Sequence, residues 1–190
     1  MGDDTSVCDD DWTCELELGP HWLENTEDDA AGAMMTAEYW VGDPTSLRQF
    51  LSGPAALLTL DSYGEAGVSQ PGIAEVADML VQRPGFVRKP EITYLDVPAG
   101  PAVRMAGPVI ERSFGGLRRQ KGHVVIFAVT PPGKDEVIEL TVAWAERRHT
   151  PELPGLADAL METLRLVPVT NEDSSGNASV AVSEPEPVAH

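Results

Sequence analysis

The 190-residue chain has no uninterrupted apolar stretch of about 18 residues, which is the length that a membrane-spanning helix needs. Its first eleven residues include five aspartates, and they lack the basic and apolar segments of a signal peptide. We therefore expect no membrane span and a cytoplasmic location. Apolar residues still make up 42% of the chain, which is enough for a globular domain with a buried core.

Cysteine is scarce as well. The two cysteines, Cys8 and Cys14, do not have the spacing of a zinc site, even with His21 nearby. A disulfide is not expected in a reducing cytoplasm, and Cys14 is expected to be a small buried hydrophobic residue. We predict no metal site.

Motifs for catalysis and cofactor binding are also missing. Ser52 and Ser113 lie near glycines, but neither is part of the G-x-S-x-G turn that presents a nucleophile. No dinucleotide-binding or phosphate-binding loop occurs, because the glycine pair at residues 115–116 precedes a predicted strand rather than a helix. We predict no catalytic residue and no cofactor, and we favour a protein that is not an enzyme.

Basic residues are few and unevenly placed. The chain has 13 lysines and arginines against 31 aspartates and glutamates, which gives a net charge of −18. Residues 1–82 hold 17 acids and 1 base, whereas residues 83–149 hold 11 bases and 7 acids. Such acidity argues against nucleic-acid binding, because most of the surface would repel phosphates. It favours a basic partner for the acidic end, and the ordinary alternative is a solvated acidic surface.

Hydrophobic periodicity predicts a series of antiparallel strands and two amphipathic helices. The chain is organised around an apolar hairpin at residues 122–146 with a proline-glycine turn, in which one face of the second strand is lightly covered. Strands are predicted at residues 12–18, 36–41, 55–60, 92–97, 102–110, 123–130 and 136–146, and helices at residues 73–83 and 153–165. A short helix is expected at residues 27–29, capped by Asn25 or Thr26, and another at residues 47–51. Residues 30–41 are ambiguous, with helix favoured at their start and strand from residue 36 onward. A loop is expected at residues 61–72, and the segment 25–72 is the least regular part of the pattern.

These elements predict an α+β fold with a single antiparallel β-sheet packed by amphipathic helices. One domain at residues 12–168 is expected to lie between a disordered acidic arm at residues 1–11 and a disordered C-terminal tail at residues 169–190.

Two basic clusters flank the apolar hairpin, one at the start of its first strand and the other after its second. Paired strands bring these two ends of the hairpin together, so the clusters are expected to be neighbours in space. The candidate interaction patch consists of Arg118, Arg119, Lys121, His123, Arg147, Arg148 and His149. It would bind an acidic partner, an anionic ligand or the chain's own acidic arm, unless these residues are only solvated strand ends.

Three features resemble one known fold family. They are the corner at residues 18–22, the turn at residues 97–104 and the long hairpin followed by a helix that ends at residues 160–166. In these features the chain is similar to the Mog1/PsbP-like αβα sandwiches, which include a large group of actinobacterial proteins. The resemblance covers residues 12–167, and the segment 25–72 departs from it. It implies a binding or assembly role rather than catalysis, and no functional residue is carried over.

We therefore predict a non-catalytic protein-interaction or accessory module with a protein partner, no nucleic acid and no membrane contact. The alternative is a small-ligand-binding protein or an unrecognised enzyme that uses the face of the sheet. The walls of such a pocket would come from the aromatic residues Trp40, Tyr63, Tyr94 and Trp144, unless these belong to the core. A homo-oligomer formed through an edge strand is compatible with either function.

Overall fold

A computed structural model of the chain describes residues 12–25, 33–47, 53–64, 68–83, 85–113, 118–146 and 151–168. Within them, side chains at residues 111–113, 118–120 and 168 are not described. The predicted arm at residues 1–11, the tail at residues 169–190 and most of the two short helices predicted in the segment 25–72 lie outside the described residues.

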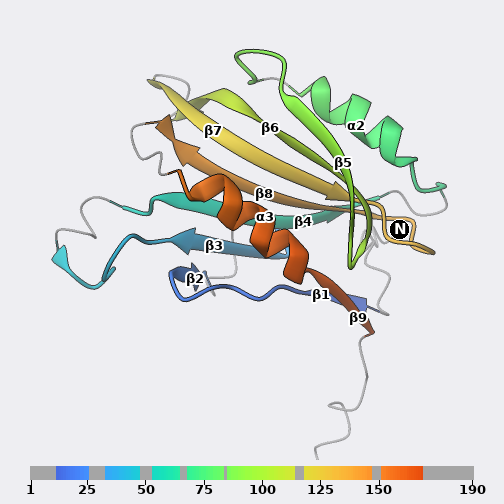
Figure 1. The fold of residues 1–190 in the computed structure, drawn as a ribbon, viewed down its shortest axis with the longest axis horizontal. Coiled ribbons are helices and arrows are strands. Elements are labelled where there is room, and N and C mark those ends of the chain that lie inside the picture. The colour runs from blue at the N-terminus through green and yellow to red at the C-terminus, as the bar shows by residue number, and fades with distance from the viewer. Residues whose placement is uncertain are drawn as a thin grey trace, which may run out of the picture.

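The described part of the chain is mostly β, with two sheets and two helices (Figure 1). Seven strands form an antiparallel sheet in the order β2-β3-β4-β8-β7-β6-β5, and β1 pairs with β9 in a second, two-stranded sheet. The strands are β1 (Trp12–Glu15), β2 (Trp22–Glu24), β3 (Met35–Tyr39), β4 (Ala56–Tyr63), β5 (Glu91–Val97), β6 (Gly100–Ser113), β7 (Arg118–Val129), β8 (Val137–Ala145) and β9 (Arg165–Pro168). The helices are α2 (Ile73–Val81) and α3 (Leu153–Thr163).

The predicted fold class was therefore wrong in one respect. The molecule is roughly α+β, but it does not consist of a single sheet packed by helices, because β1 leaves the main sheet to pair with β9. Residues 165–168 were expected to follow a helix into a tail. Four residues are too few to show a strand period, and their partner lies about 150 residues away in the sequence, so neither signal was available locally.

The main sheet buries both of its faces. On one face, α3 packs through Leu160 and Met161 against residues such as Phe127 of β7 and Leu140 of β8. On the other face, α2 packs through Val76 and Leu80 against the opposite sides of β6 and β7. Each fully buried side chain of this size contributes about 1.5–3 kcal/mol of hydrophobic stabilisation. Both helices were predicted from their apolar stripes, and that prediction is confirmed.

The central hairpin also has the predicted alternation, with Ile138 and Leu140 buried on the α3 face of β8. The expectation of a wet or lightly covered second face is confirmed for Thr141, Ala143 and Ala145, which are half-buried, but it was wrong for Glu139, which is buried. The end of α2 and the chain that follows it cover this side of the strand. Polar residues extend three strands beyond their predicted ends: β4 reaches Tyr63, β6 reaches Ser113 and β7 begins at Arg118.

Candidate binding groove

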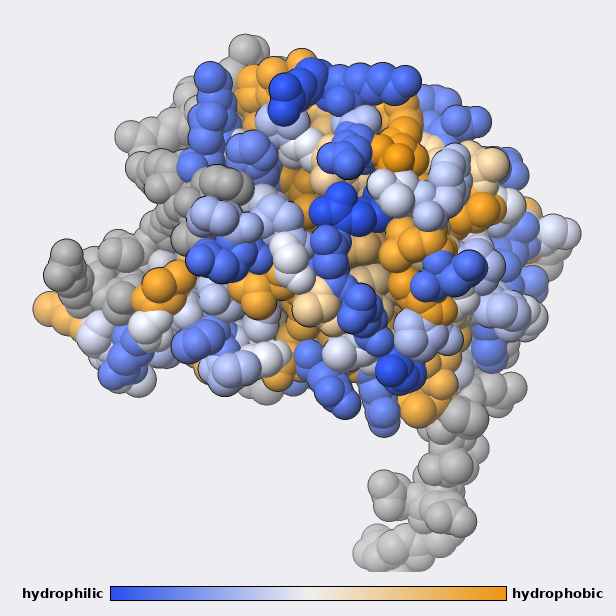
Figure 2. Space-filling model, in the orientation of Figure 1, coloured by the Kyte–Doolittle hydropathy of each residue, from blue (hydrophilic) through white to orange (hydrophobic). Residues whose placement is uncertain are grey.

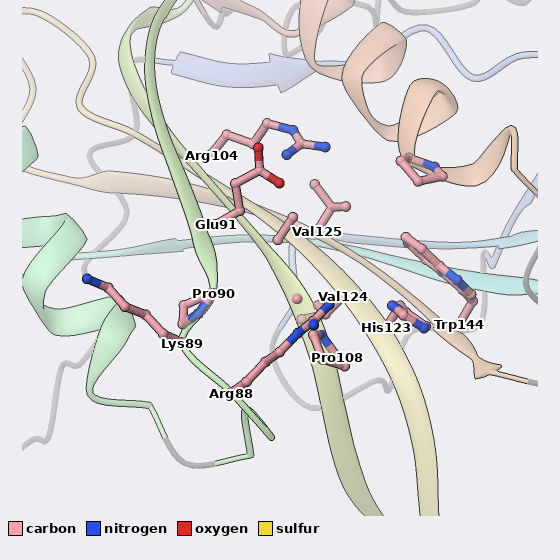
Figure 3. Close-up of a pocket in the computed structure, with 13 residues that line it drawn as sticks. Arg88, Lys89, Pro90, Glu91, Arg104, Pro108, His123, Val124, Val125 and Trp144 are labelled. Atoms are coloured by element: carbon pink, nitrogen blue, oxygen red, sulfur yellow. The ribbon is translucent and has the colours of Figure 1, made fainter.

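A groove of about 520 Å³ lies on the α3 face of the sheet, where β5, β6 and β7 extend past the N-terminal end of α3 (Figure 3). The segment before β5 contributes Arg88 and Lys89, and the first residue of that strand is Glu91. The other strands contribute Arg104, His123 and Trp144, and α3 contributes Pro154. This is within the range of about 300–1,000 Å³ that is usual for ligand sites.

Arg104 is the most firmly held basic residue of the groove. Its Nε donates a hydrogen bond of 2.6 Å to Oδ1 of Asp158 in α3, and its guanidinium carbon lies 5.9 Å from the centre of the Phe127 ring. Only 17% of the Arg104 side chain is exposed. Among the residues that the structure describes, none hydrogen-bonds to its two terminal nitrogens, which can therefore bind a planar oxyanion through two parallel hydrogen bonds.

Glu91 is the one acidic side chain among the described residues that line the groove. Thr93 lies directly opposite Arg104 in the pairing of β5 and β6, and Ala106 lies opposite Glu91. Glu91 and Arg104 are therefore diagonal neighbours on the same face of the sheet, and Figure 3 shows them side by side. The end of the groove near Arg104 thus contains both a cation and a strong hydrogen-bond acceptor.

Aromatic and apolar residues form the other wall. His123 lies opposite Trp144 in the pairing of β7 and β8, and their rings stack with centres 5.9 Å apart and planes 14° apart. The neighbouring Gly122 allows this close approach, because a Cβ atom there would lie 2.7 Å from the carbonyl oxygen of Trp144. His123 and Pro154 are half-buried and form most of the accessible part of this wall, because Trp144 and Val125 are only 6% and 1% exposed.

The groove concentrates positive charge in an acidic protein. The structure describes the side chains of seven lysines and arginines, and three of these line the groove: Arg88, Lys89 and Arg104. Lys89 points away from the others in Figure 3 and belongs to the rim. Because a concave site with walls of low dielectric focuses the field of its charges, the field of these bases is stronger inside the groove than it would be on an open surface.

The predicted interaction patch is only partly described. His123 lines the groove, and Lys121 is exposed two residues earlier on the same side of β7. Arg118 and Arg119 lie in β7, but their side chains are outside the described set, and residues 147–149 lie outside it altogether. The hairpin register places Gly122 opposite Ala145, so the two ends of the hairpin lie together.

Sequence reasoning missed the three basic residues that line the groove. For Arg104 a signal existed, because it occupies the same face of β6 as Ala102 and Ala106 and so interrupts an apolar alternation. Arg88 and Lys89 precede the predicted strand at residues 92–97, as Lys121 precedes the predicted strand at residues 123–130. They are, however, far from the hairpin in the sequence. Nothing local showed that β5 would bring them beside His123.

The four aromatic residues suggested as pocket walls have different roles in the structure. Only Trp144 lines the groove. Trp40 is buried and donates a hydrogen bond of 3.1 Å from its Nε1 to Glu38, whereas Tyr94 is 57% exposed on the edge strand β5. Tyr63 lies half-buried on the opposite face of the sheet.

On that opposite face, a second group of ionisable side chains surrounds Glu139. Glu139 is buried, with 7% of the residue exposed, and its carboxylate accepts hydrogen bonds of 2.5 and 2.6 Å from the two terminal nitrogens of Arg83. Asp61 lies directly opposite Glu139 in the strand pairing. Burial and the charge of Glu139 both raise the pKa of the Asp61 carboxyl, and the same two causes raise the pKa of Tyr63. We assign this group a structural role, because Arg83 joins the end of α2 to β8.

Within the described residues, no group of three histidines, cysteines, aspartates or glutamates is placed to hold a metal ion. None of the described helices has the length and apolarity needed to cross a membrane. Cys14 is half-buried, and burial together with the charge of Glu136 raises its pKa to about 11.

No family model matches the chain, and neither does any curated protein. Among solved structures, the chain is similar to LpqN, which is described as involved in cell envelope biogenesis of Mycobacterium tuberculosis. The two structures align with a TM-score of 0.57 and 16% sequence identity, over 86% of this chain and 88% of LpqN. A protein from Bacteroides thetaiotaomicron aligns with a TM-score of 0.45 and 9% identity over 80% of this chain and 44% of that one, which is too weak to support an argument. At this identity the likeness to LpqN shows a shared fold with an actinobacterial protein. The resemblance to the Mog1/PsbP-like sandwiches is not confirmed.

Proposed function

We propose that this protein is a non-catalytic accessory protein of cell envelope biogenesis, and that it works by binding an anionic partner in the groove beside Arg104. The observation that carries the proposal is the groove itself, which is lined by three of the seven described basic side chains on a chain of net charge −18. The envelope role is supported by the fold shared with LpqN, whose description names that process. The predicted cytoplasmic location stays a prediction that cell fractionation would test.

A matched pair of charge reversals tests this function. Arg88→Glu places a negative charge at the groove, and Lys134→Glu makes the same change of charge at the far end of the hairpin. Each variant and the wild type are immobilised, and an extract of the cell envelope is applied at low and high salt. We expect wild type and Lys134→Glu to retain the same component, with retention that falls as salt rises, and Arg88→Glu to lose it.

Equal retention by all three proteins would contradict the proposal, because it would separate binding from the groove. Retention that does not respond to salt would contradict the anionic nature of the partner. The predicted protein partner remains one form that the anion could take, and a retained polypeptide would identify it.

A further inference from the structure

We infer that the occupant of the groove is an anionic saccharide, meaning a sugar unit that carries a carboxylate or a phosphate. This inference rests on the proposed function, that the groove binds an anion, and it adds the chemical class of that anion. Three parts of the groove each match a different part of such a ligand. They are the guanidinium of Arg104, the carboxylate of Glu91, and the stacked rings of His123 and Trp144.

The guanidinium of Arg104 matches the charged group. Asp158 holds Nε, and the Phe127 ring lies beside the guanidinium, so both the position and the plane of the group are set before a ligand arrives. A carboxylate and a phosphate both present two oxygens at the spacing of the two terminal nitrogens. Because the side chain is largely shielded from water, this contact is stronger than one made by an exposed arginine such as Arg88.

Glu91 matches hydroxyl groups. An ionised carboxylate only accepts hydrogen bonds, so it needs a partner that donates them. A sugar has several hydroxyl donors close to its charged group, at the distance that separates Glu91 from its diagonal neighbour Arg104. An acidic polypeptide would instead bring further negative charges next to Glu91, which would repel them. Glu91 therefore favours a ligand with one charge and many hydroxyls.

The ring pair matches the body of the sugar. The faces of aromatic rings carry partial negative charge and attract C–H groups, which cover one face of a pyranose ring. The half-buried ring of His123 supplies this surface with Pro154 beside it, and the Trp144 ring, which is 6% exposed, stacks against the His123 ring. A volume of about 520 Å³ suits a small ligand, whereas a stable contact between folded proteins covers about 800 Å² on each partner.

The indole N–H signals of the four tryptophans in nitrogen-edited NMR spectra provide a local readout. Trp144→Phe assigns the signal of the groove. The wild type is titrated with glucuronate, a hexose phosphate, glucose, inorganic phosphate and an oligoglutamate peptide. We expect both sugar anions to shift the Trp144 signal to saturation, and the other three probes to bind about tenfold more weakly or worse.

Two variants test the role of the guanidinium. Arg104→Lys keeps the charge but loses the planar fork, and Asp158→Asn replaces the charged acceptor that fixes the fork by a weaker, neutral amide oxygen. Each is expected to weaken glucuronate binding by about tenfold, while Lys134→Gln leaves it unchanged. The other three indole signals report whether a variant is folded. If Arg104→Lys does not fold, Asp158→Asn provides the same test.

The outcomes separate the two claims. If oligoglutamate binds more tightly than both sugar anions and depends on Arg104, the saccharide inference is wrong and the anion-binding function stands. If glucose binds as tightly as glucuronate, or phosphate as tightly as the hexose phosphate, the inference is also wrong. If no anion shifts the Trp144 signal, both claims fail.

Discussion

Replacing Arg83 by alanine is expected to destabilise the fold more than any other removal of a partly exposed charge in the described residues. The Glu139 carboxylate would lose both hydrogen bonds from the guanidinium, and Asp61 lies directly opposite it. Thr141 would remain as a donor, through a hydroxyl hydrogen bond of 3.2 Å. Arg83→Ala therefore leaves a buried carboxylate with only the hydroxyl groups of Thr141 and Tyr63 as partners, beside a second acid.

The size of this effect follows from the burial of the two partners. A unit charge pair about 4 Å apart attracts by about 4 kcal/mol at an effective dielectric constant of about 20. Breaking a fully buried pair costs about 3–5 kcal/mol. The Glu139 side chain is 9% exposed but that of Arg83 is 41% exposed, so water will enter the vacated space. We therefore expect a loss of about 2–3 kcal/mol in the free energy of unfolding at neutral pH, or roughly 5–10 °C in the melting temperature.

Urea denaturation of wild type, Arg83→Ala and Arg88→Ala measures this loss. Arg88 is exposed and makes no ion pair within the described residues, so Arg88→Ala should change stability by less than about 0.5 kcal/mol. Adding Glu139→Gln completes a double-mutant cycle, in which we expect a favourable coupling of about 1–3 kcal/mol. A loss for Arg83→Ala as small as that for Arg88→Ala would refute the claim that Arg83 anchors the end of α2 to β8.

Two further predictions concern titratable groups. Because the pKa of Asp61 is raised in the folded state, its ionised form destabilises the fold. Asp61→Asn should therefore raise the free energy of unfolding at pH 7 by about 0.2–1 kcal/mol, measured by urea denaturation. This gain should vanish as the pH falls through 3.8, the ordinary pKa of the group. A gain that persists below that value would contradict the electrostatic cause. Folding raises the pKa of Cys14 from 9.0 to about 11. In a Cys8→Ser background at pH 8, Cys14 should therefore react with a thiol reagent roughly 100-fold more slowly in the folded chain than in the unfolded chain. Equal rates in the two states would show that the thiol is exposed.

Local patterns predicted most of the regular structure. The β-branched and aromatic run of residues 123–129 and the stripe of α2 identified buried elements correctly, because each pattern depends on neighbours within a few residues. The turn predicted before β6 is also present, and Gly100 there has a φ of 139°, a conformation that glycine adopts readily. Such elements are encoded locally.

Long-range pairing accounts for the errors. The partner of β1 is the four-residue strand β9, and the partner of β4 is β8, far along the chain. Polar strand extensions such as Arg118–Lys121 were interpreted as an exposed connection, because their backbone pairs with β6 while their composition resembles a loop. The same cause hid the groove. His123 was identified as a candidate from its position at a strand end, but Arg104 and Glu91 join it only through the register of β5, β6 and β7.

The claim that the groove beside Arg104 binds an anionic saccharide is tested most directly by a crystal structure of the full chain grown with glucuronate. We predict the carboxylate of the sugar at hydrogen-bond distance from both terminal nitrogens of Arg104, with the sugar ring against His123 and hydroxyl groups donating to Glu91. An empty groove in crystals that hold glucuronate at other basic residues, such as Lys134, would contradict the account.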